Sequence, residues 1–407
     1  MRIAFVCGFA WEPKGTVRLR TFAMAAELVR LGHQATIFTV PYDNRADSGH
    51  RWTIDGVEVR NSKVSRSCLS YPAALLNMMK DVCDFAPDVV HIVKPKGFSG
   101  AAAALLMATT QFPIVTDCDD WEGWGGWNEV KPYPWLLKQF IHSMECGLMR
   151  YSAALTVASR VLFQRSVALR GSDANLVYLP NCLSASQIEK IDQFRNLDQD
   201  ALKTELGYPG DKAILYAGHY EAGDDISFFA RAAAEVSEQT GSVVIFVGEG
   251  PELGHVRDIF ASQPKAKVVF LGQLTYDRYL KALSSCDVAA FPYPDTAAYR
   301  AKCSVRIIEY MAMGKPVLTT CVGQNIEYIE DGVSGSVAVP GDHADFAARL
   351  THLLLYPEEG SLLGQNARDR VLEKFAWEIS SGRLCEQVYM QVVRQRRGGV
   401  GLEPRNR

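Results

Sequence analysis

The sequence has no long hydrophobic run, no closely paired cysteines and no strong excess of charge of either sign. The longest apolar stretch, near residues 101–108, is too short to cross a bilayer, so any membrane contact is expected to be peripheral. The ten cysteines are scattered without a C-x-x-C pair, which is typical of reduced thiols rather than of a disulfide framework or a zinc ribbon. A net charge of −3 argues against a dedicated nucleic-acid-binding protein.

Short β-branched runs alternate with amphipathic helical patterns over the whole chain of 407 residues, 48% of which are hydrophobic. Such alternation predicts parallel sheets with crossover helices. The predicted strands are residues 2–7, 35–40, 57–60, 88–93, 113–117, 154–157, 176–179, 213–217, 243–247, 267–271, 287–291 and 316–320. Because a single sheet of a dozen strands would be unusual, the sequence predicts an α/β protein with two doubly wound domains.

The predicted domain boundary lies where a strand ends at Pro180-Asn181 and a polar segment begins. Residues 1–183 form the first predicted domain and residues 184–371 the second. A helix within 372–395 is expected to pack back on the first domain, before a basic, flexible tail at 396–407. Residues 1–183 carry 19 Lys and Arg against 16 Asp and Glu, which predicts a weak attraction to an anionic acceptor or membrane surface.

A glycine-containing turn follows the first predicted strand and leads into a helix predicted at residues 20–31. Such a turn exposes backbone N–H groups and a helix N-terminus to an anion. It matches neither the dinucleotide fingerprint nor the P-loop pattern, so the interpretation as an anion or acceptor site rests on Gly15, Thr16 and Arg18. The alternative is a plain chain reversal.

The segment 116–129 holds three aspartates, two glutamates and three tryptophans directly after a predicted strand. Doubly wound domains place their ligands at the carboxyl ends of strands. Carboxylates serve acid–base chemistry or hold a metal, and tryptophan faces stack on sugar rings. The candidate residues are Asp119 for catalysis and, for binding of the acceptor, Asp117, Asp120, Trp121 and Trp124. The alternative is structural, with aspartates that cap a helix and tryptophans that pack; a metal is disfavoured because neighbouring aspartates point in different directions.

Two glycine turns follow successive strands in the second half of the chain, at residues 216–225 and 247–251. Paired glycine turns at strand ends let a nucleotide approach the backbone closely. Together they predict a nucleotide site, with the candidate residues Gly218, His219, Gly248 and Gly250.

The most informative stretch is residues 299–317. Lys302, Arg306 and Glu309 recur at helical spacing, so they are expected to share one face at the start of a helix. Two cations at a helix N-terminus are unfavourable for the helix itself, which predicts a pyrophosphate that neutralises them and a ribose bound by Glu309. Cys303, Ser304 and Val305 are assigned to the same ligand. A solvated charged face is the alternative.

The run EYMAMGKPV at residues 309–317, with Gly323, Glu327, Gly332, Gly335 and residues 339–342 after it, resembles glycosyltransferase family 4. Residues 31–38, 158–160, 179–181, 246–252 and 270–272 resemble further signatures of that family, so the resemblance spans nearly the whole chain. It implies the GT-B architecture, with two facing Rossmann-like domains and a C-terminal helix that crosses back to the first. It also implies retaining transfer of a sugar from a nucleoside diphosphate sugar.

The resemblance also assigns roles to single residues. Glu309 matches the second glutamate of the E-x7-E motif, which contacts the nucleotide ribose. Gly218 and Gly248 match the turns near the diphosphate and the nucleoside, and Leu274 falls where the base is covered. Asp119 falls where many members carry a histidine near the reacting centre. The first domain would hold the acceptor.

The sequence departs from the family pattern at three further positions. Ala301 stands where the first glutamate of the motif belongs, and His219 and Ala222 replace the Arg and Lys that bind the diphosphate in many members. Lys302 and Arg306 resemble a K-C-x-x-K variant of the family, so they are expected to restore the lost charge.

The expected reaction is transfer of a sugar from a UDP- or GDP-sugar to a glycan, lipid-linked or small-molecule acceptor, in cell-surface glycan or glycolipid synthesis. Lys302 and Arg306 would stabilise negative charge on the leaving diphosphate. Asp119, with Asp117 as a second candidate, would stabilise positive charge on the sugar ring. Neither a metal nor a cofactor is expected, and nucleic acid is not an expected partner. The expected location is cytoplasmic, with peripheral contact at the inner face of the membrane. The alternatives are a non-catalytic sugar-nucleotide-binding partner and a sugar-nucleotide epimerase of the same architecture.

Overall fold

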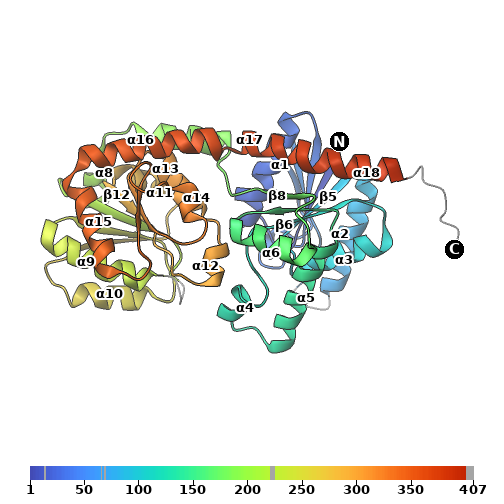
Figure 1. Cartoon of the computed structure of the whole chain (residues 1–407), viewed down its shortest axis with the longest axis horizontal. Helices are drawn as coiled ribbons and strands as arrows, with labels where there is room; N and C mark the ends of the chain where they lie inside the picture. The colour runs from blue at the N-terminus through green and yellow to red at the C-terminus, as the bar shows by residue number, and fades with distance from the viewer. Residues whose placement is uncertain (13–14, 66, 68–69, 221–224, 400–407) are drawn as a thin grey trace. The chain divides into compact units, whose positions relative to one another are not determined.

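The computed structural model describes residues 1–12, 15–65, 67, 70–220 and 225–399, and these form two compact units (Figure 1). The first unit comprises Met1–Ser184, Ala301–Cys303 and the chain from Trp377 onward. The second comprises Ala185–Arg300 and Ser304–Ala376. The units differ from the predicted domains, because residue 371 lies inside a helix of the second unit and Ala301–Cys303 belong to the first.

The first unit is built on an eight-stranded sheet of order β3-β4-β2-β1-β5-β6-β7-β8, parallel except where β3 runs antiparallel to β4. Its strands are β1 (Arg2–Cys7), β2 (Gln34–Thr39), β3 (Arg51–Ile54), β4 (Val57–Asn61), β5 (Val89–Val93), β6 (Ile114–Cys118), β7 (Ala154–Val157) and β8 (Leu176–Tyr178). Every residue of β5, β6 and β7 is buried, as continuous apolar strands require when helices cover both faces.

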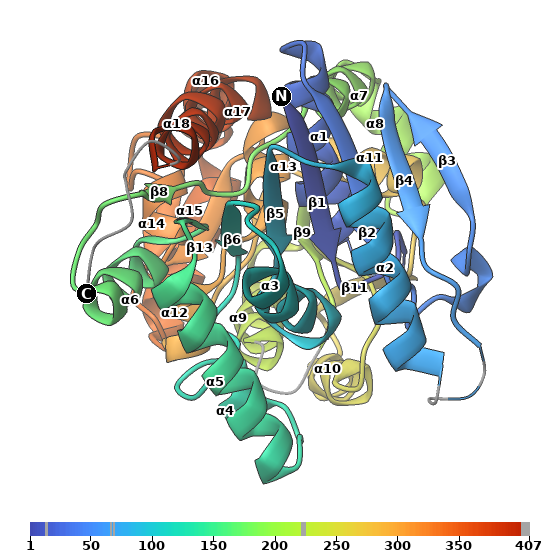
Figure 2. The same cartoon turned by 90° about the vertical axis from the view of Figure 1, so that its right-hand side faces the viewer.

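The helices of the first unit follow the strands in regular alternation. They are α1 (Ala23–Arg30), α2 (Tyr71–Phe85), α3 (Gly97–Thr109), α4 (Trp127–Val130), α5 (Trp135–Tyr151), α6 (Arg160–Arg170), α17 (Trp377–Leu384) and α18 (Met390–Gly399), with a π-helical turn at Thr16–Phe22, another at Cys385–Tyr389 and a 3₁₀ turn at Arg45–Asp47. Figure 2 shows α2 and α3 in front of the strands, and Met78 of α2 and Leu106 of α3 pack with Val6 and Ile92 in one core cluster.

Strand β3 is the one strand of this sheet that the sequence analysis missed. It is joined to β4 by Asp55 and Gly56, whose φ angles of 49° and 78° form the left-handed turn that suits a two-residue hairpin. The strand lies at the sheet edge and most of its side chains are exposed, so it lacks the apolar run used to find the others.

The second unit holds a six-stranded parallel sheet of order β11-β10-β9-β12-β13-β14. Its strands are β9 (Ala213–Ala217), β10 (Val243–Val247), β11 (Lys267–Gly272), β12 (Val288–Ala290), β13 (Val317–Thr320) and β14 (Ser336–Ala338). Its helices are α7 (Ala185–Arg195), α8 (Gln199–Leu206), α9 (Ile226–Thr240), α10 (Leu253–Ala261), α11 (Tyr276–Ser285), α12 (Ala297–Ala301), α13 (Val305–Ala312), α14 (Asn325–Tyr328), α15 (His343–Leu355) and α16 (Pro357–Lys374). Two parallel α/β sheets confirm the predicted fold class. The sequence analysis missed β14, which has three residues.

The chain returns to the first unit at Trp377, whose N–H donates to the carbonyl of Leu183 at 2.9 Å. Helix α17 then packs on α1, and the Tyr389 hydroxyl lies 2.5 Å from Nδ1 of the buried His91. This confirms the expectation that the C-terminal helix packs on the first domain, although it is divided into α17, a π-helical turn and α18. The part of the predicted tail from residue 400 lies outside the described residues.

Two further expectations concern cysteines and membranes. The nine cysteines in the described part of the chain form no disulfide. No helix among the described residues has the length and apolar character needed to cross a membrane.

Candidate functional site

At the carboxyl end of β6, the carboxylate of Asp117 is fully buried and paired with Arg20. The Arg20 guanidinium donates from Nε to Oδ2 at 2.7 Å and from Nη2 to Oδ1 at 2.6 Å. The hydroxyl of Thr156 donates to Oδ1 at 2.7 Å. Burial alone would raise the pKa of Asp117, but the Arg20 charge and these hydrogen bonds hold it below its usual value.

Asp117 was predicted to bind the acceptor, and its surroundings argue against that role. Its exposed fraction is 0%, and both oxygens accept hydrogen bonds from protein groups. The same guanidinium also donates to the side-chain carbonyl of Asn181 at 2.9 Å. Asn181 in turn donates from its amide to the carbonyl of Cys303 at 2.7 Å. Asp117 thus anchors a buried network that ends on the backbone next to Lys302.

A second charged cluster surrounds the ammonium of Lys94. This residue directly follows β5 and has a left-handed backbone φ of 58°. It lies 2.6 Å from Asp120, 3.4 Å from Asp119 and 3.4 Å from Glu122. Lys96 binds the other oxygen of Glu122 at 2.5 Å. Although burial opposes its charge, the three carboxylates hold the pKa of Lys94 well above its usual value.

Asp119 differs from its neighbours in this cluster. Burial, together with the nearby carboxylates of Asp120 and Asp117, raises its pKa to about 7, while Lys94 opposes the rise. The pKa of Asp120 is lowered, because its contact with Lys94 outweighs its burial. Among the described residues, no group donates a hydrogen bond to the buried Oδ1 of Asp119. A buried carboxyl group with a raised pKa and an unpartnered oxygen is a candidate for a functional residue.

The structure contradicts the prediction that Lys302, Arg306 and Glu309 share one helical face. Helix α13 begins at Val305, so Lys302 precedes it and belongs to the first unit. There its ammonium lies 5.6 Å from the centre of the Trp127 ring and helps to lower the pKa of Asp120. The helical spacing failed because α12 ends at Ala301 and a non-helical segment separates it from α13.

Ala301, which replaces a family glutamate, lies in an apolar environment. It is fully buried and packs in a cluster with Cys118 of β6, Leu155 of β7 and Met149 of α5. A glutamate at this position would lose its hydration without a partner, which explains why alanine fits here.

The two tryptophans predicted to contact the acceptor are held by their own loop. Gly125 and Gly126 pack so closely on Trp121 that a Cβ at Gly126 would lie 2.1 Å from the Trp121 carbonyl. The Arg165 guanidinium covers the Trp121 ring at 4.7 Å. The Trp124 indole N–H donates to Gln139 at 3.0 Å. These contacts favour the structural interpretation for both tryptophans, each of which is half-buried.

The predicted anion turn is only partly supported by its geometry. Helical structure begins at Thr16 instead of residue 20, and Gly15 accepts the N–H of Leu19 at 2.7 Å. The side chain of Arg18 is 38% exposed and donates to Glu12 at 2.8 Å. Arg18 therefore points to an acid rather than presenting an unopposed charge. Residues 13 and 14 of this turn lie outside the described residues.

One trio of potential metal ligands occurs in the described residues, at His142, Glu145 and Cys146 of α5. Glu145 already accepts from two backbone N–H groups of the tryptophan loop and from Arg165 at 2.8 Å. Arg165 also lies 3.5 Å from the Cys146 sulfur. Because a guanidinium occupies the position that a cation would take, this trio stabilises the loop and does not fit a metal.

In the second unit, the glycine turns after β9 and β10 pack against one another. The N–H of Gly218 donates to the carbonyl of Val247 at 3.0 Å, and that of Tyr220 to Glu249 at 3.1 Å. Gly248 has a φ of 119°, and a Cβ there would lie 1.9 Å from the Gly218 carbonyl. Gly250 is similarly tight against Tyr220. Contact between the two turns therefore requires these glycines whether or not a nucleotide approaches.

Arg306 and Glu309 lie on α13 in an ion pair of 2.8 Å. The hydroxyl of Tyr279, on α11, donates to the same Glu309 oxygen at 3.0 Å, and the Arg306 guanidinium lies 4.4 Å from the Tyr279 ring centre. The second oxygen of Glu309 has no partner among the described residues, while 42% of the Arg306 side chain is exposed. The pair is therefore preorganised, with one carboxylate oxygen and part of a guanidinium available.

This pair lies at the carboxyl ends of the strands, as the glycine turns do. Tyr310, next to Glu309 on α13, accepts the N–H of Ala217 at 2.9 Å, and Ala217 is the last residue of β9. Leu274 is half-buried in the loop after Gly272 of β11, and His219 is exposed directly after Gly218. Ser304 precedes α13 and Val305 begins it. Ala222 lies outside the described residues.

Sequence reasoning missed several residues that shape these edges. Arg20 begins the helix predicted at residues 20–31 and receives no role there, and the sequence assigns no role to Tyr279. Lys94 and Lys96 had a usable signal, because the run Lys-Pro-Lys directly follows a predicted strand. No local signal identifies Arg20, since its partner Asp117 is 97 residues away.

Comparison with known proteins supplies two family matches in chain order. The model described as "Glycosyl transferase 4-like domain" matches residues 15–182, and "Glycosyl transferases group 1" matches residues 211–355. The sulfoquinovosyl transferase SQD2 of Arabidopsis thaliana is 21% identical over 328 residues, which cover 78% of this chain and 59% of that protein. The chain thus spans less than two thirds of the length of this relative.

Solved structures share the fold over nearly the whole chain. A sucrose-phosphate synthase from Thermosynechococcus elongatus superimposes with a TM-score of 0.73 at 17% identity, over 98% of this chain and 99% of that one. HepE from Anabaena, solved with UDP and glucose, gives a TM-score of 0.70 at 15% identity over 95% and 98% of the two chains.

Proposed function

The chain belongs to the group 1, family 4-like glycosyltransferases, and we propose that it transfers a sugar, with retention of configuration, from a nucleoside diphosphate sugar to a hydroxyl acceptor. The observation that carries this proposal is the Arg306–Glu309–Tyr279 arrangement at the edge that holds the glycine turns. The Glu309 carboxylate can accept hydrogen bonds from ribose hydroxyls, and the Arg306 guanidinium can bind phosphate. Ribose hydroxyls and phosphates are groups that a sugar nucleotide presents.

The donor side rests on the second unit. Glu309 would accept hydrogen bonds from the ribose through the oxygen that Tyr279 and Arg306 leave unused. The exposed part of the Arg306 guanidinium would stabilise charge on the leaving diphosphate. A UDP-sugar is the favoured donor, because the structural neighbour HepE binds UDP and glucose. With a protein cation in this role, the reaction is proposed to proceed without a metal.

Asp119 is proposed to act on the sugar in the first unit. In a retaining transfer of this kind the leaving diphosphate takes the acceptor proton, so the protein needs no strong nucleophile. An ionised Asp119 would stabilise positive charge on the sugar ring through its unused oxygen. Because its pKa is raised to about 7, turnover is expected to rise as the pH passes through that value. Lys302, held near Asp120 and Trp127, would contribute a second cation.

The acceptor is proposed to be lipid-linked and reached at a membrane surface. The first turns of α5 carry exposed Trp135 (61%), Leu136 (75%) and Phe140 (52%), and Figure 2 shows this end of α5 projecting from the strands. Lys138 lies among them, with its ammonium 5.6 Å from the centre of the Trp124 ring. Exposed Trp, Leu and Phe with a flanking lysine are the composition of helices that lie in a membrane interface. We also propose a cytoplasmic, membrane-peripheral location.

Vesicle co-sedimentation tests the membrane contact. The double variant Trp135→Ser and Leu136→Ser should lose binding to phosphatidylglycerol-containing vesicles. The matched control, Leu76→Ser with Leu362→Ser, also removes two exposed apolar side chains and should bind as the wild type does. Equal binding by both double variants, or no binding by the wild type, would exclude α5 as the contact.

The transferase activity is tested first by donor binding and then by turnover. UDP, GDP, ADP and CMP are compared for thermal stabilisation, and the stabilising nucleotide chooses the sugar nucleotide used in a hydrolysis and transfer assay. Asp119→Asn should lower turnover by about a hundredfold with little change in nucleotide affinity. The control Asp84→Asn changes an exposed aspartate and should have no effect. Nucleotide binding without any turnover would favour a non-catalytic binder, and release of an altered sugar nucleotide without acceptor would favour an epimerase.

A further inference from the structure

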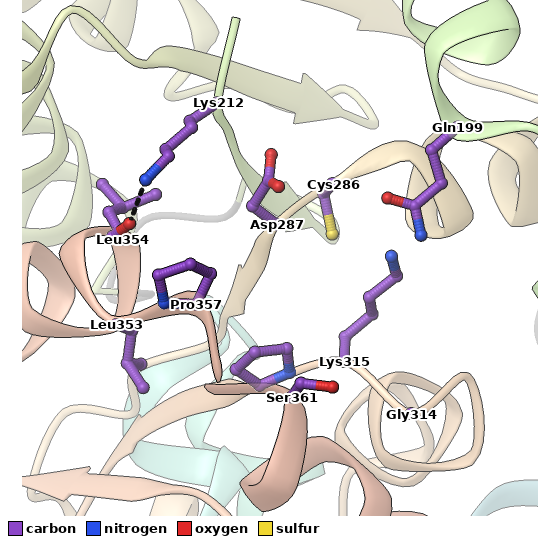
Figure 3. Close-up of a pocket in the computed structure, with 11 residues that line it drawn as sticks. Gln199, Lys212, Cys286, Asp287, Gly314, Lys315, Leu353, Leu354, Pro357 and Ser361 are labelled. Carbon is purple, nitrogen blue, oxygen red and sulfur yellow. Dashed lines mark hydrogen bonds between the residues drawn. The ribbon is translucent and has the colours of Figure 1, made fainter. Parts of the chain in front are cut away.

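The second unit contains a cavity that the proposed transfer does not use. It has a volume of about 230 Å³ and is lined by residues that include Gln199, Lys212, Asp287, Lys315 and Ser361 (Figure 3). Asp287 immediately precedes β12, Pro316 immediately precedes β13, and Lys212 precedes β9. The cavity therefore lies at the amino ends of these strands, at the opposite sheet edge from the glycine turns and the first turn of α13.

Lys315 is the central residue of this cavity. Its side chain is more than nine-tenths buried, and Figure 3 shows it extending from the chain between Gly314 and Pro316 into the space below Gln199 and Cys286. Its ammonium makes no hydrogen bond or ion pair with any described residue. Burial lowers the pKa of Lys315, because removal of the ammonium from water penalises its charged form.

The neighbouring charges leave the cavity positive. Asp287 is the only acid among the described residues that line it, and Lys203 binds this carboxylate at 2.9 Å. Lys212 is a second lining cation and donates to the carbonyl of Leu354 at 2.6 Å. The Arg195 side chain also lies beside Gly314, where a Cβ would be 3.2 Å from its Nε. Asp287 attracts Lys315 without forming an ion pair with it, and Lys203 already binds that carboxylate, so the positive charges prevail.

We propose that this cavity is a second anion site, which binds a phosphate group through Lys315. Lysine acts as a point charge toward phosphate, and the amide of Gln199 and the hydroxyl of Ser361 supply further donors at the rim. A phosphate would give the buried ammonium the partner that the protein does not provide. The shared chemistry covers both inorganic phosphate and the phosphate group of a small organic ester.

The test is a calorimetric titration of the full chain with inorganic phosphate and with methyl phosphate. Sodium chloride at equal ionic strength serves as the control titrant. Lys315→Met should lower phosphate affinity at least tenfold, whereas Lys315→Arg should keep it. The control Lys265→Met removes an exposed lysine of the same unit and should bind within twofold of the wild type. Binding of both phosphates would indicate a site for an organic phosphate, and binding of inorganic phosphate alone a site for the free ion.

A measurement on the wild type keeps the test independent of variant folding. Reductive methylation followed by peptide mass spectrometry should show that phosphate slows the modification of Lys315 and leaves that of Lys265 unchanged. Lys315→Met is expected to melt no lower than the wild type in phosphate-free buffer, because it removes a buried unpartnered charge. The proposal is overturned if chloride has the same effect as phosphate, if Lys315→Met keeps the wild-type affinity, or if phosphate does not protect Lys315.

Discussion

The two sheets have the same parallel construction, yet their carboxyl edges are built from different chemistry. At the carboxyl ends of the first sheet's strands lies a network of charges, in which Asp117 pairs with Arg20 and three carboxylates surround Lys94. The edge of the second sheet is mostly backbone, with glycine turns packed together and charge confined to Arg306 and Glu309. The first edge therefore depends on side chains being present, and the second on side chains being absent.

This difference has a direct energetic meaning. Removing one member of a buried ion pair leaves its partner charged and unsatisfied, which is costly. Adding one methyl group to a turn in which two backbones touch forces those backbones apart, which is also costly. Removal of a buried carboxylate from the first unit and addition of a methyl group to a glycine turn of the second should thus lower the free energy of unfolding by similar amounts. The same two kinds of substitution at exposed positions should have little effect.

The largest expected effect is that of Asp117→Ala in the first unit. It would leave the buried Arg20 guanidinium without its carboxylate, so the free energy of unfolding should fall by about 3–5 kcal/mol. Urea denaturation measures the loss. The control Asp81→Ala breaks a pair with Arg51, whose side chain is 54% exposed, and should cost at most about 1 kcal/mol. Equal losses in the two variants would contradict a buried-charge edge.

The matching change in the second unit is Gly248→Ala. Its Cβ would lie 1.9 Å from the Gly218 carbonyl, at a φ of 119° that other residues rarely adopt. The free energy of unfolding should fall by about 2–4 kcal/mol, measured by the same denaturation. Gly254→Ala, in α10 with nothing within 4 Å of the added Cβ, should be neutral or slightly stabilising. A neutral Gly248→Ala would show that the two turns do not pack as described.

A smaller effect is expected for Arg306→Ala, which tests the charge that the second edge does have. If Arg306 meets the diphosphate, the affinity for UDP should fall tenfold to a hundredfold, or by about 1.4–2.7 kcal/mol. Isothermal titration measures the change. Arg278→Ala removes an exposed arginine from α11 and should leave the affinity unchanged. An unchanged affinity in Arg306→Ala would remove this residue from the donor site.

The smallest effect concerns Asp119 and depends on pH. Because its pKa is raised to about 7 in the folded protein, ionisation between about pH 4 and 7 opposes folding, and the cost persists above pH 7. Asp119→Asn removes that cost. The variant should therefore be more stable than the wild type by about 1–2 kcal/mol at pH 8, and the difference should shrink toward pH 4.

Denaturation at several pH values checks this prediction. The exposed control Asp84→Asn should show no such pH-dependent difference. A variant that is less stable than the wild type at pH 8 would mean that the carboxylate form of Asp119 is the one that the fold favours.

Most of the fold could be predicted from the sequence, because strand formation here is a local property. The strands at Ala154–Val157, Ala213–Ala217 and Val243–Val247 have the predicted bounds, since each is an apolar run that ends at a polar or glycine-containing turn. The exposed edge strand Arg51–Ile54 and the three-residue strand Ser336–Ala338 lack that local signal, so they were missed.

The site residues could be predicted only in part. The glycine turns and the Arg306–Glu309 helix were found because glycine content and helical spacing are visible in the sequence. The spacing of Lys302 was misleading, because it assumed one helix where the chain has two separated by a non-helical segment. Which unit Lys302 contacts depends on packing, and no periodicity carries that information.

Asp117 and Asp119 illustrate how far local sequence patterns reach and where folding adds information. The sequence placed both at the carboxyl end of one strand, and it indicated that this end is a ligand edge. It could not distinguish them, because their environments come from residues far along the chain. Arg20 forms an ion pair with Asp117. Asp119, beside Lys94, has a raised pKa and one oxygen without a hydrogen-bond partner among the described residues. Local patterns determine which elements form, but the charge state of a buried group depends on every residue that folding brings near it.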